Sequence, residues 1–273
     1  MAFHRFEDLA VHHLNPHLST GLGPVIEGET MYFRVISKKA GTGSEPHYHP
    51  NELMTFPIRG KMNCLVGRER RMVGPGTFVH VPPCARHSFR ATEDGDMDYL
   101  YIKDRTWTLI GTAHDEALPE KAQSAVEVAR EIAAGRRPGQ EKAPEKSQAI
   151  IDGLGCCYYP MAESLDAPQP SGHHEQWVEG RHLAFGFVQS PRGHIEQVAS
   201  APHEYFFYMI DGVLDVEIGG ENRCLVSGDV AQIPRGAAYR IEVREPARHA
   251  GVRSTAQLEQ HIAKHGAADN WRG

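Results

Sequence analysis

Turn-forming and acidic residues recur in this chain of 273 residues at one constant spacing of 152 positions. The second half therefore repeats the turn pattern of the first, although many residues between the turns differ. Self-similarity of this kind predicts two copies of one architecture. Six pairs share the spacing: Gly41 and Gly193, Pro50 and Pro202, Glu52 and Glu204, Gly60 and Gly212, Gly76 and Gly228, and Pro82 and Pro234.

Within a copy, short runs rich in β-branched and aromatic residues alternate with glycine and proline turns. Residues 29–37 form such a run before Gly41, and residues 97–102 form another after the turn at 93–96. Several short strands separated by turns every eight to twelve residues are typical of a β-barrel or a β-sandwich. The sequence therefore predicts an all-β fold.

Three histidines in the first copy form a candidate metal site. His47 and His49 are two positions apart in a predicted strand, so their side chains point to the same face. His87 follows a second stretch in which a glycine turn, an apolar strand and a proline precede it. Imidazoles that converge in this way suit a divalent metal ion.

These two stretches resemble the two cupin motifs, G-x5-H-x-H-x3-E-x6-G and G-x5-P-x-G-x2-H. The resemblance implies a bicupin, two tandem jelly-roll β-barrel domains joined by a helix-containing linker. Cys84 stands where the second motif has its inner glycine, and the motif's acidic position is occupied by Leu53. The matching positions are Gly41, His47, His49, Gly60, Gly76, Pro82 and His87.

Glu52 is one position out of step with the motif's acidic ligand. Strand alternation turns its side chain away from the face that carries His47 and His49. We therefore expect three neutral imidazoles as ligands. A β-bulge that rotates Glu52 inward as a fourth ligand is the open alternative.

We expect three segments along the chain. Residues 1–112 form the N-terminal barrel with the metal site, 113–149 a helical and charged linker, and 150–273 the C-terminal barrel. A helix of about four turns is predicted from Pro119 to Gly135, followed by a charged, exposed stretch at 136–148. Residues 255–265 are predicted to form a closing helix.

The second copy lacks the candidate ligands. The constant spacing places Ala199, Ala201 and Tyr239 where the first copy has its three histidines. We therefore expect a C-terminal barrel without metal, serving a structural, pocket-closing or oligomerising role. Bicupins can use such a barrel in a dimer interface, so a homodimer is expected.

Composition excludes several classes of partner. A formal net charge of −6 offers no basic surface for a nucleic acid, and no apolar run is long enough to span a membrane. The N-terminal residues lack the apolar core of a signal peptide. Five cysteines without C-x-x-C pairs do not suggest a disulfide framework. We expect a cytoplasmic protein.

The three-histidine pattern resembles the three-histidine cupin dioxygenases that act on gentisate, salicylate and β-diketones. This resemblance implies an Fe(II) dioxygenase that uses dioxygen to cleave a small hydroxybenzoate-like or enolisable substrate. One alternative is a non-redox lyase, isomerase or cyclase with Zn, Ni or Mn at the same ligands. Another is a bicupin that binds a small molecule without catalysis.

Three further residues are candidates for orienting an anionic substrate. Tyr99 and Tyr101 share one face of the strand at 97–102. Arg34 could bind a carboxylate or an enolate through its planar guanidinium. Alternation alone does not decide whether Phe33 or Arg34 faces the interior, so an arginine on the outer face stays open.

A measurable consequence is the metal content. Because two alanines and a tyrosine cannot replace imidazole ligands, we expect one divalent metal per chain. Elemental analysis of purified protein measures this ratio. Two tightly bound metals per chain would contradict the assignment of a degenerate second copy.

Overall fold

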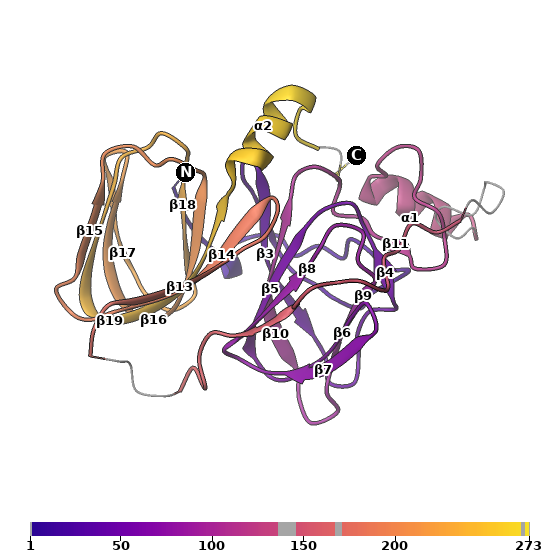
Figure 1. Ribbon diagram of the computed structural model, residues 1–273, viewed down its shortest axis with the longest axis horizontal. Coiled ribbons are helices and arrows are strands. Elements are labelled where there is room, and N and C mark those ends of the chain that lie inside the picture. Colours follow the sequence, from indigo (N-terminus) through magenta and orange to yellow (C-terminus); the bar gives the residue numbers. More distant parts are fainter. Residues whose placement is uncertain (1, 136–145, 167–170, 269–270, 273) are drawn as a thin grey trace.

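The computed structural model describes residues 2–135, 146–166, 171–268 and 271–272, and it consists of two β-barrels that lie side by side (Figure 1). The all-β architecture of two tandem barrels is confirmed. The part of the predicted charged stretch from 136 to 145 lies outside the described residues. No helix in the described ranges combines the length and the apolar character needed to cross a membrane.

The N-terminal barrel consists of two antiparallel sheets. One sheet has the strand order β12-β8-β5-β10-β3-β2, and the other has the order β11-β4-β9-β6-β7. The strands are β2 (Val25–Glu27), β3 (Met31–Lys38), β4 (His47–Tyr48), β5 (Leu53–Arg59), β6 (Met62–Val66), β7 (Glu69–Val73), β8 (Thr77–Val81), β9 (His87–Ala91), β10 (Met97–Asp104), β11 (Thr112–Ala113) and β12 (Tyr158–Pro160).

The C-terminal barrel is built around two long strands, β16 and β19, which contribute to both faces of the barrel. They bend where the register shifts, at 209–214 of β16. Gly60 separates two strands in the first barrel, whereas β16 continues through Gly212; both glycines have positive φ, at 76° and 83°. The strands are β1 (Phe3–Arg5), β13 (His174–Glu179), β14 (Leu183–Ser190), β15 (Ile195–Val198), β16 (Tyr205–Ile218), β17 (Glu221–Leu225), β18 (Asp229–Ile233) and β19 (Tyr239–Ser254).

Two α-helices and one 3-10 turn (η1, Phe6–Asp8) complete the described elements. Helix α2 (Ala256–His265) agrees with the predicted closing helix. Helix α1 (Ala125–Ala133) is shorter than predicted, because a capping box between Ser124 and Glu127 starts it six residues after Pro119. Nine residues make about two and a half turns rather than four.

An aromatic layer joins the two barrels. One face of the six-stranded sheet packs against one face of the C-terminal sheet, and side chains from both halves form a single buried cluster. Phe78 stacks on Phe185 with ring centroids 4.3 Å apart, and Phe33 stacks on Phe206 at 5.1 Å. Fully burying each of these rings contributes about 2–3 kcal/mol, so the barrels are packed as one body.

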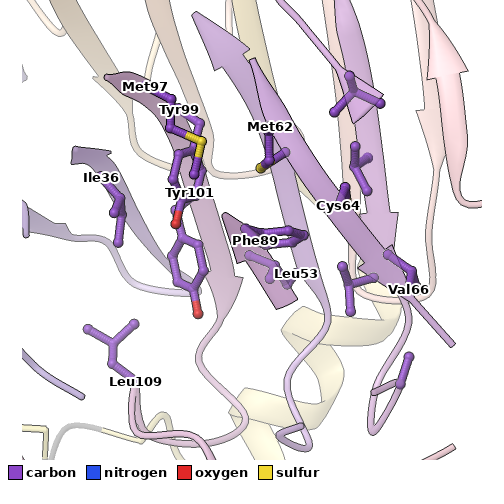
Figure 2. Close-up of a cluster of buried hydrophobic side chains, with 14 of the residues drawn as sticks. Ile36, Leu53, Met62, Cys64, Val66, Phe89, Met97, Tyr99, Tyr101 and Leu109 are labelled. Atoms are coloured by element: carbon purple, nitrogen blue, oxygen red, sulfur yellow. The ribbon is translucent and has the colours of Figure 1, made fainter. Parts of the chain in front are cut away.

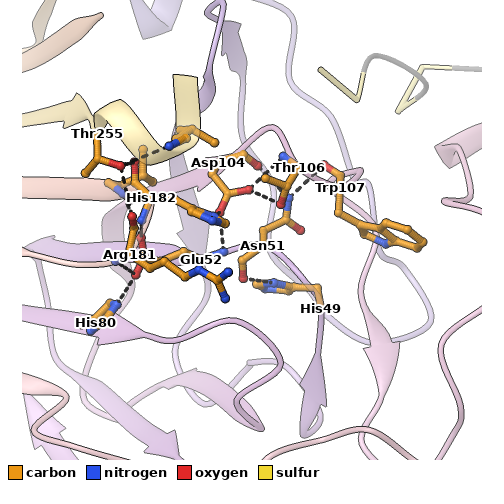
Figure 3. Close-up of polar contacts among 12 residues, drawn as sticks. His49, Asn51, Glu52, His80, Asp104, Thr106, Trp107, Arg181, His182 and Thr255 are labelled. Carbon is orange, nitrogen blue, oxygen red and sulfur yellow. Dashed lines mark hydrogen bonds and ion pairs between the residues drawn. The ribbon is translucent and has the colours of Figure 1, made fainter. Parts of the chain in front are cut away.

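Two buried carboxylates reach across this layer in opposite directions. Glu52 accepts hydrogen bonds from the backbone N–H groups of residues 181–183, at 2.7–2.9 Å (Figure 3). Glu204, its counterpart at the 152-residue spacing, accepts from the N–H groups of Glu29 and Thr30, at 2.7 and 2.8 Å. Each carboxylate thus caps the turn that precedes the leading strand of the other barrel. The prediction that Glu52 faces away from the histidines is confirmed.

The surroundings of the two carboxylates repeat as well. Gly28 and Gly180 occupy equivalent turns, and a Cβ at either would lie 2.4 or 2.3 Å from the facing carboxylate oxygen. His80 donates to Glu52 at 2.7 Å, so this histidine has a partner that its sequence context did not reveal. Burial raises the pKa of Glu52, but the bonds from His80 and the backbone outweigh burial and leave that pKa below its usual value.

Short strands also cross between the two halves of the chain. The N-terminal strand β1 pairs with β18 of the C-terminal barrel, and β12 pairs with β8 of the N-terminal barrel. Trp271, near the C-terminus, is buried in the core of the N-terminal barrel. The domain boundaries expected at 112 and 149 stay a prediction, and these pairings cross them.

We predict that Glu52→Gln destabilises the protein without releasing metal. The amide keeps one acceptor oxygen but places an NH2 group against backbone donors, and each unsatisfied donor costs about 1–3 kcal/mol. Thermal unfolding should show this loss, and Glu204→Gln should show a similar one. Metal content should stay near that of the wild type in both variants.

The comparison variant is His49→Ala, which should lose most of the metal. Equal metal loss in Glu52→Gln and His49→Ala would contradict the separation between the interface carboxylate and the histidine cluster.

Candidate metal centre

The three predicted histidines meet on the five-stranded sheet of the N-terminal barrel. His47 on β4 is directly opposite His87 on β9, and His49 follows β4. Their ring centroids are 4.3–6.2 Å apart, and one ligand atom from each lies within 4.8 Å of the others. Among the described residues, these three histidines are the one group of three or more His, Cys, Asp or Glu side chains that could hold a metal ion.

The hydrogen bonds of the imidazoles select the tautomer that a metal needs. Each Nδ1 lies within hydrogen-bond distance of a backbone carbonyl, at 2.8 Å for His47, 3.1 Å for His49 and 2.9 Å for His87. A carbonyl only accepts, so Nδ1 carries the proton and Nε2 keeps its lone pair. In His49 and His87 the buried Nε2 has no hydrogen-bond partner. The donor set therefore fits a divalent ion bound through Nε2.

Burial keeps these imidazoles neutral at ordinary pH. It lowers the pKa of His47 and His49 well below the usual value and lowers the pKa of His87 to about 3. Burial is the largest cause in each case, because a charged imidazolium loses its hydration. Neutral imidazole is the form that coordinates metals, so no proton has to leave before binding at neutral pH.

Two tight backbone approaches hold the ligands in place. Cys84, the substitute for the motif's inner glycine, has φ +61°, and its N–H donates to the carbonyl of His49 at 2.9 Å. A left-handed conformation at a non-glycine residue costs about 1–2 kcal/mol, which the motif's glycine avoids. Gly111 leaves room for His47, because a Cβ there would lie 2.8 Å from the ring.

Outside the cluster, Asn51 supports His49. The Nδ1 of His49 donates to the Asn51 carbonyl, and the Asn51 amide donates to the carbonyls of Asp104 and Trp107 at 2.7 and 2.9 Å (Figure 3). The N–H of Glu52 donates to the Asp104 carboxylate at 2.7 Å. The buried residues Asn51 and Asp104 thus connect His49 to Glu52 at the interface between the barrels.

The three predicted substrate-orienting residues lie inside the same barrel. Tyr99 and Tyr101 on β10 point into the interior beside Phe89 (Figure 2). Arg34 on β3 pairs with Tyr101 across the sheet and is only 2% exposed, so the inward alternative holds and the outer-face one is wrong. A small cavity of about 30 Å³ is lined by Arg34, both tyrosines and His47. Their roles in catalysis stay a prediction.

Two buried lysines complete this interior, and the sequence analysis did not single them out. Lys38 follows Arg34 by four residues on β3, and Lys103 follows Tyr99 by four on β10. Both are nearly inaccessible, at 3% and 0% exposure. Counting onward by twos from Arg34 and Tyr99 would have placed them on the inner face.

These three cations have no carboxylate as a hydrogen-bond partner in the part of the chain that the structure describes. Their bonds go to backbone carbonyls, from Arg34 to residues 23 and 24, from Lys38 to Phe89 and from Lys103 to Leu109. Burial lowers the pKa of Arg34 to about 10, that of Lys38 to about 7 and that of Lys103 well below its usual value. Burying a charge without an opposite charge is costly, so the interior is prepared for an anion.

Comparison with known proteins supports the architecture. Residues 33–103 match the family model of the Cupin domain. The sequence matches no curated protein.

Among solved structures, oxalate decarboxylase from Bacillus subtilis is similar over most of both chains. One structure, at pH 4.6, has a TM-score of 0.64 and 18% sequence identity, covering 93% of this chain and 76% of that one. Another, from a study of the Mn(II) centres of the same enzyme, has a TM-score of 0.62 and 17% identity, covering 93% and 77%. At this identity the likeness concerns the fold. The chain has a fold of two tandem jelly-roll β-barrels, of which the first contains the segment that matches the Cupin domain and the three histidines that could hold a metal ion.

Proposed function

We propose that the protein is a metal-dependent enzyme that acts on a small carboxylate or enolate anion, by non-redox chemistry of the lyase, isomerase or cyclase type. The observation that carries this proposal is the pairing of three histidine Nε2 atoms with three buried basic side chains, Arg34, Lys38 and Lys103, which lack carboxylate hydrogen-bond partners among the described residues.

Each part of the interior has a distinct role in this proposal. His47, His49 and His87 would hold the metal, whose positive charge polarises a bound carboxylate or carbonyl group. Arg34 supplies positive charge and Lys38 an amine that gains and loses a proton near neutral pH; both lie on β3, beside His47, in the same cavity. Because that cavity is about 30 Å³, roughly the share of one water, the segment at residues 14–21 that lines it would have to move to admit even a small carboxylate.

Proton transfer can come from the chain itself. When a bond between a carbon and a carboxylate breaks, carbon dioxide leaves and the electron pair stays on the remaining carbon, which must then take up a proton. The Lys38 ammonium lies in the cavity, and its pKa near 7 lets it give a proton and regain one at neutral pH. Tyr99 and Tyr101 can donate hydrogen bonds, since burial raises their pKa and keeps them protonated.

The structural neighbours favour this class of reaction over the dioxygenase first expected. Both are named as a decarboxylase, an enzyme that cleaves a carbon–carbon bond, and one has Mn(II) centres. Manganese was among the alternative metals. Their low identity means that oxalate itself is not carried over to this chain.

An Fe(II) dioxygenase is the second candidate, and the position of Glu52 favours it. That carboxylate is held by the opposite barrel, so the site offers three neutral ligands, as in the dioxygenases that the motif resembles. Dioxygen would then be a second substrate. The same three histidines serve both candidates.

Turnover with and without oxygen separates the two. We expect manganese- or zinc-loaded protein to convert a small carboxylate from a panel of oxo acids, hydroxy acids and dicarboxylates under anaerobic conditions, with products followed by NMR. Oxygen uptake by the iron form, together with loss of turnover in the zinc form, would replace the lyase proposal with the dioxygenase.

Lys38→Met should stabilise the metal-free protein while abolishing turnover. With a folded pKa near 7 and an ordinary value of 10.5, the unfolded chain binds this proton first as the pH falls. The wild type therefore loses stability between pH 10.5 and 7, and the loss persists below 7. Thermal unfolding should show the largest gain for Lys38→Met at pH 7 and little gain above pH 10.5. If Lys38→Met were less stable than the wild type at pH 7, the interpretation of Lys38 as a buried amine without an opposite charge would be contradicted.

A further inference from the structure

The C-terminal barrel contains a second cavity, of about 110 Å³, at the end that corresponds to the metal site of the first barrel. Its floor is formed by β14, β16 and β19, the counterparts of the strands around the histidines. The residues used below are Glu175, Trp177, Glu196, Tyr205, Tyr239 and His249. Nothing in the proposed function assigns this cavity a role.

Two glycines show that this interior is rebuilt for aromatic rings. Gly186 stands where the first barrel has Arg34, and its partner across the strands is Gly251, as Tyr101 is the partner of Arg34. A Cβ at Gly186 would lie 2.7 Å from the Trp177 ring, and one at Gly251 would lie 2.6 Å from the Tyr205 ring. The second barrel thus has two glycines where the first has Arg34 and Tyr101, and the Trp177 and Tyr205 rings fill the space beside these glycines.

The cavity carries two carboxylates, Glu175 and Glu196, and each accepts a hydrogen bond from a neutral aromatic side chain. Glu175 accepts from the Trp177 indole at 2.6 Å, and Glu196 accepts from the Tyr239 hydroxyl at 2.5 Å. Neutral donors orient a carboxylate without cancelling its charge. Both carboxylates therefore present negative charge to the cavity.

The other titratable groups that face the cavity leave the charge negative. Burial lowers the pKa of His249 to about 3, so its imidazole, 3.1 Å from the Tyr205 hydroxyl, is neutral. His173 lies within 3.3 Å of Glu175, and His203 within 3.0 Å of Glu259 on α2. Arg253 is the cation at the wall; it lies over the Trp177 ring at 4.3 Å and within 3.7 Å of Glu179.

We propose that this cavity binds a small organic ammonium ion. Carboxylates combined with aromatic rings such as those of Tyr205 and Tyr239 are the chemistry that recognises alkylated ammonium groups, because the ring faces and the anions both attract the cation. A volume of about 110 Å³ equals the share of three or four water molecules at ~30 Å³ each, which suits a tetra-alkylammonium head group. The first barrel would exclude the same ligand through its buried cations.

The test compares three probes of similar shape on the full-length, metal-loaded protein. Tetramethylammonium is the cation, tert-butanol the neutral analogue and trimethylacetate the anion. Binding is followed by isothermal titration and by fluorescence of Trp177, one of three tryptophans in the chain. We expect the ammonium ion alone to change the Trp177 signal, and Trp177→Phe to remove that change.

Two substitutions test whether the negative charge of Glu196 contributes to binding of the ammonium ion. Glu196→Gln keeps an acceptor for Tyr239 but removes the charge, and it should weaken tetramethylammonium binding by about tenfold. Glu221→Gln, an exposed glutamate on β17 of the same barrel, is the matched control and should bind as the wild type does.

Several outcomes would overturn the proposal. They are absence of ammonium binding to the wild type, an equal response to tert-butanol or trimethylacetate at Trp177, and an equal loss in Glu196→Gln and Glu221→Gln. The wild-type comparison decides by itself if Glu196→Gln fails to fold, which circular dichroism would show.

Discussion

Two carboxylates exchanged between the barrels hold the architecture together. Glu52 and Glu204 are each fully buried, and each binds the backbone of the other barrel at a turn before its leading strand. A buried carboxylate is tolerated only when its acceptor sites are filled, and here the backbone donors belong to the opposite half of the chain. The aromatic layer supplies most of the buried area between the barrels. The two carboxylates set how one barrel is aligned against the other.

This arrangement explains why Glu52 cannot also be a ligand. Its side chain leaves β5 on the face opposite the histidines, and the same face carries Met54 and Phe56 into the interface cluster. Through Asn51 and Asp104 the backbone beside Glu52 still touches the support of His49. The metal site and the interface are therefore neighbours along the chain, although the histidines belong to the five-stranded sheet and the interface residues of β5 to the six-stranded one.

Much of the fold follows from pattern alone, because turn glycines at one spacing and period-two alternation are local signals. The same signals located the three histidines and turned Glu52 away. The start of α1 was misplaced because Pro119 suits a first helical turn, whereas the capping box at Ser124 acts later. Lys38 and Lys103 were overlooked because lysines are usually exposed, and the contact between His80 and Glu52 was not predicted because it depends on how β5 and β8 pair across the sheet. The aromatic filling of the second interior was equally hidden, since it depends on which rings lie over Gly186 and Gly251.

The crossing of β1 and β12 between the barrels has a consequence for how the chain matures. Strand β1 is synthesised more than two hundred residues before its pairing partner β18. The N-terminal barrel likewise waits for β12 and for Trp271 near the C-terminus. The N-terminal barrel is therefore incomplete when its own segment leaves the ribosome, and its final closure waits for residues from the second half of the chain.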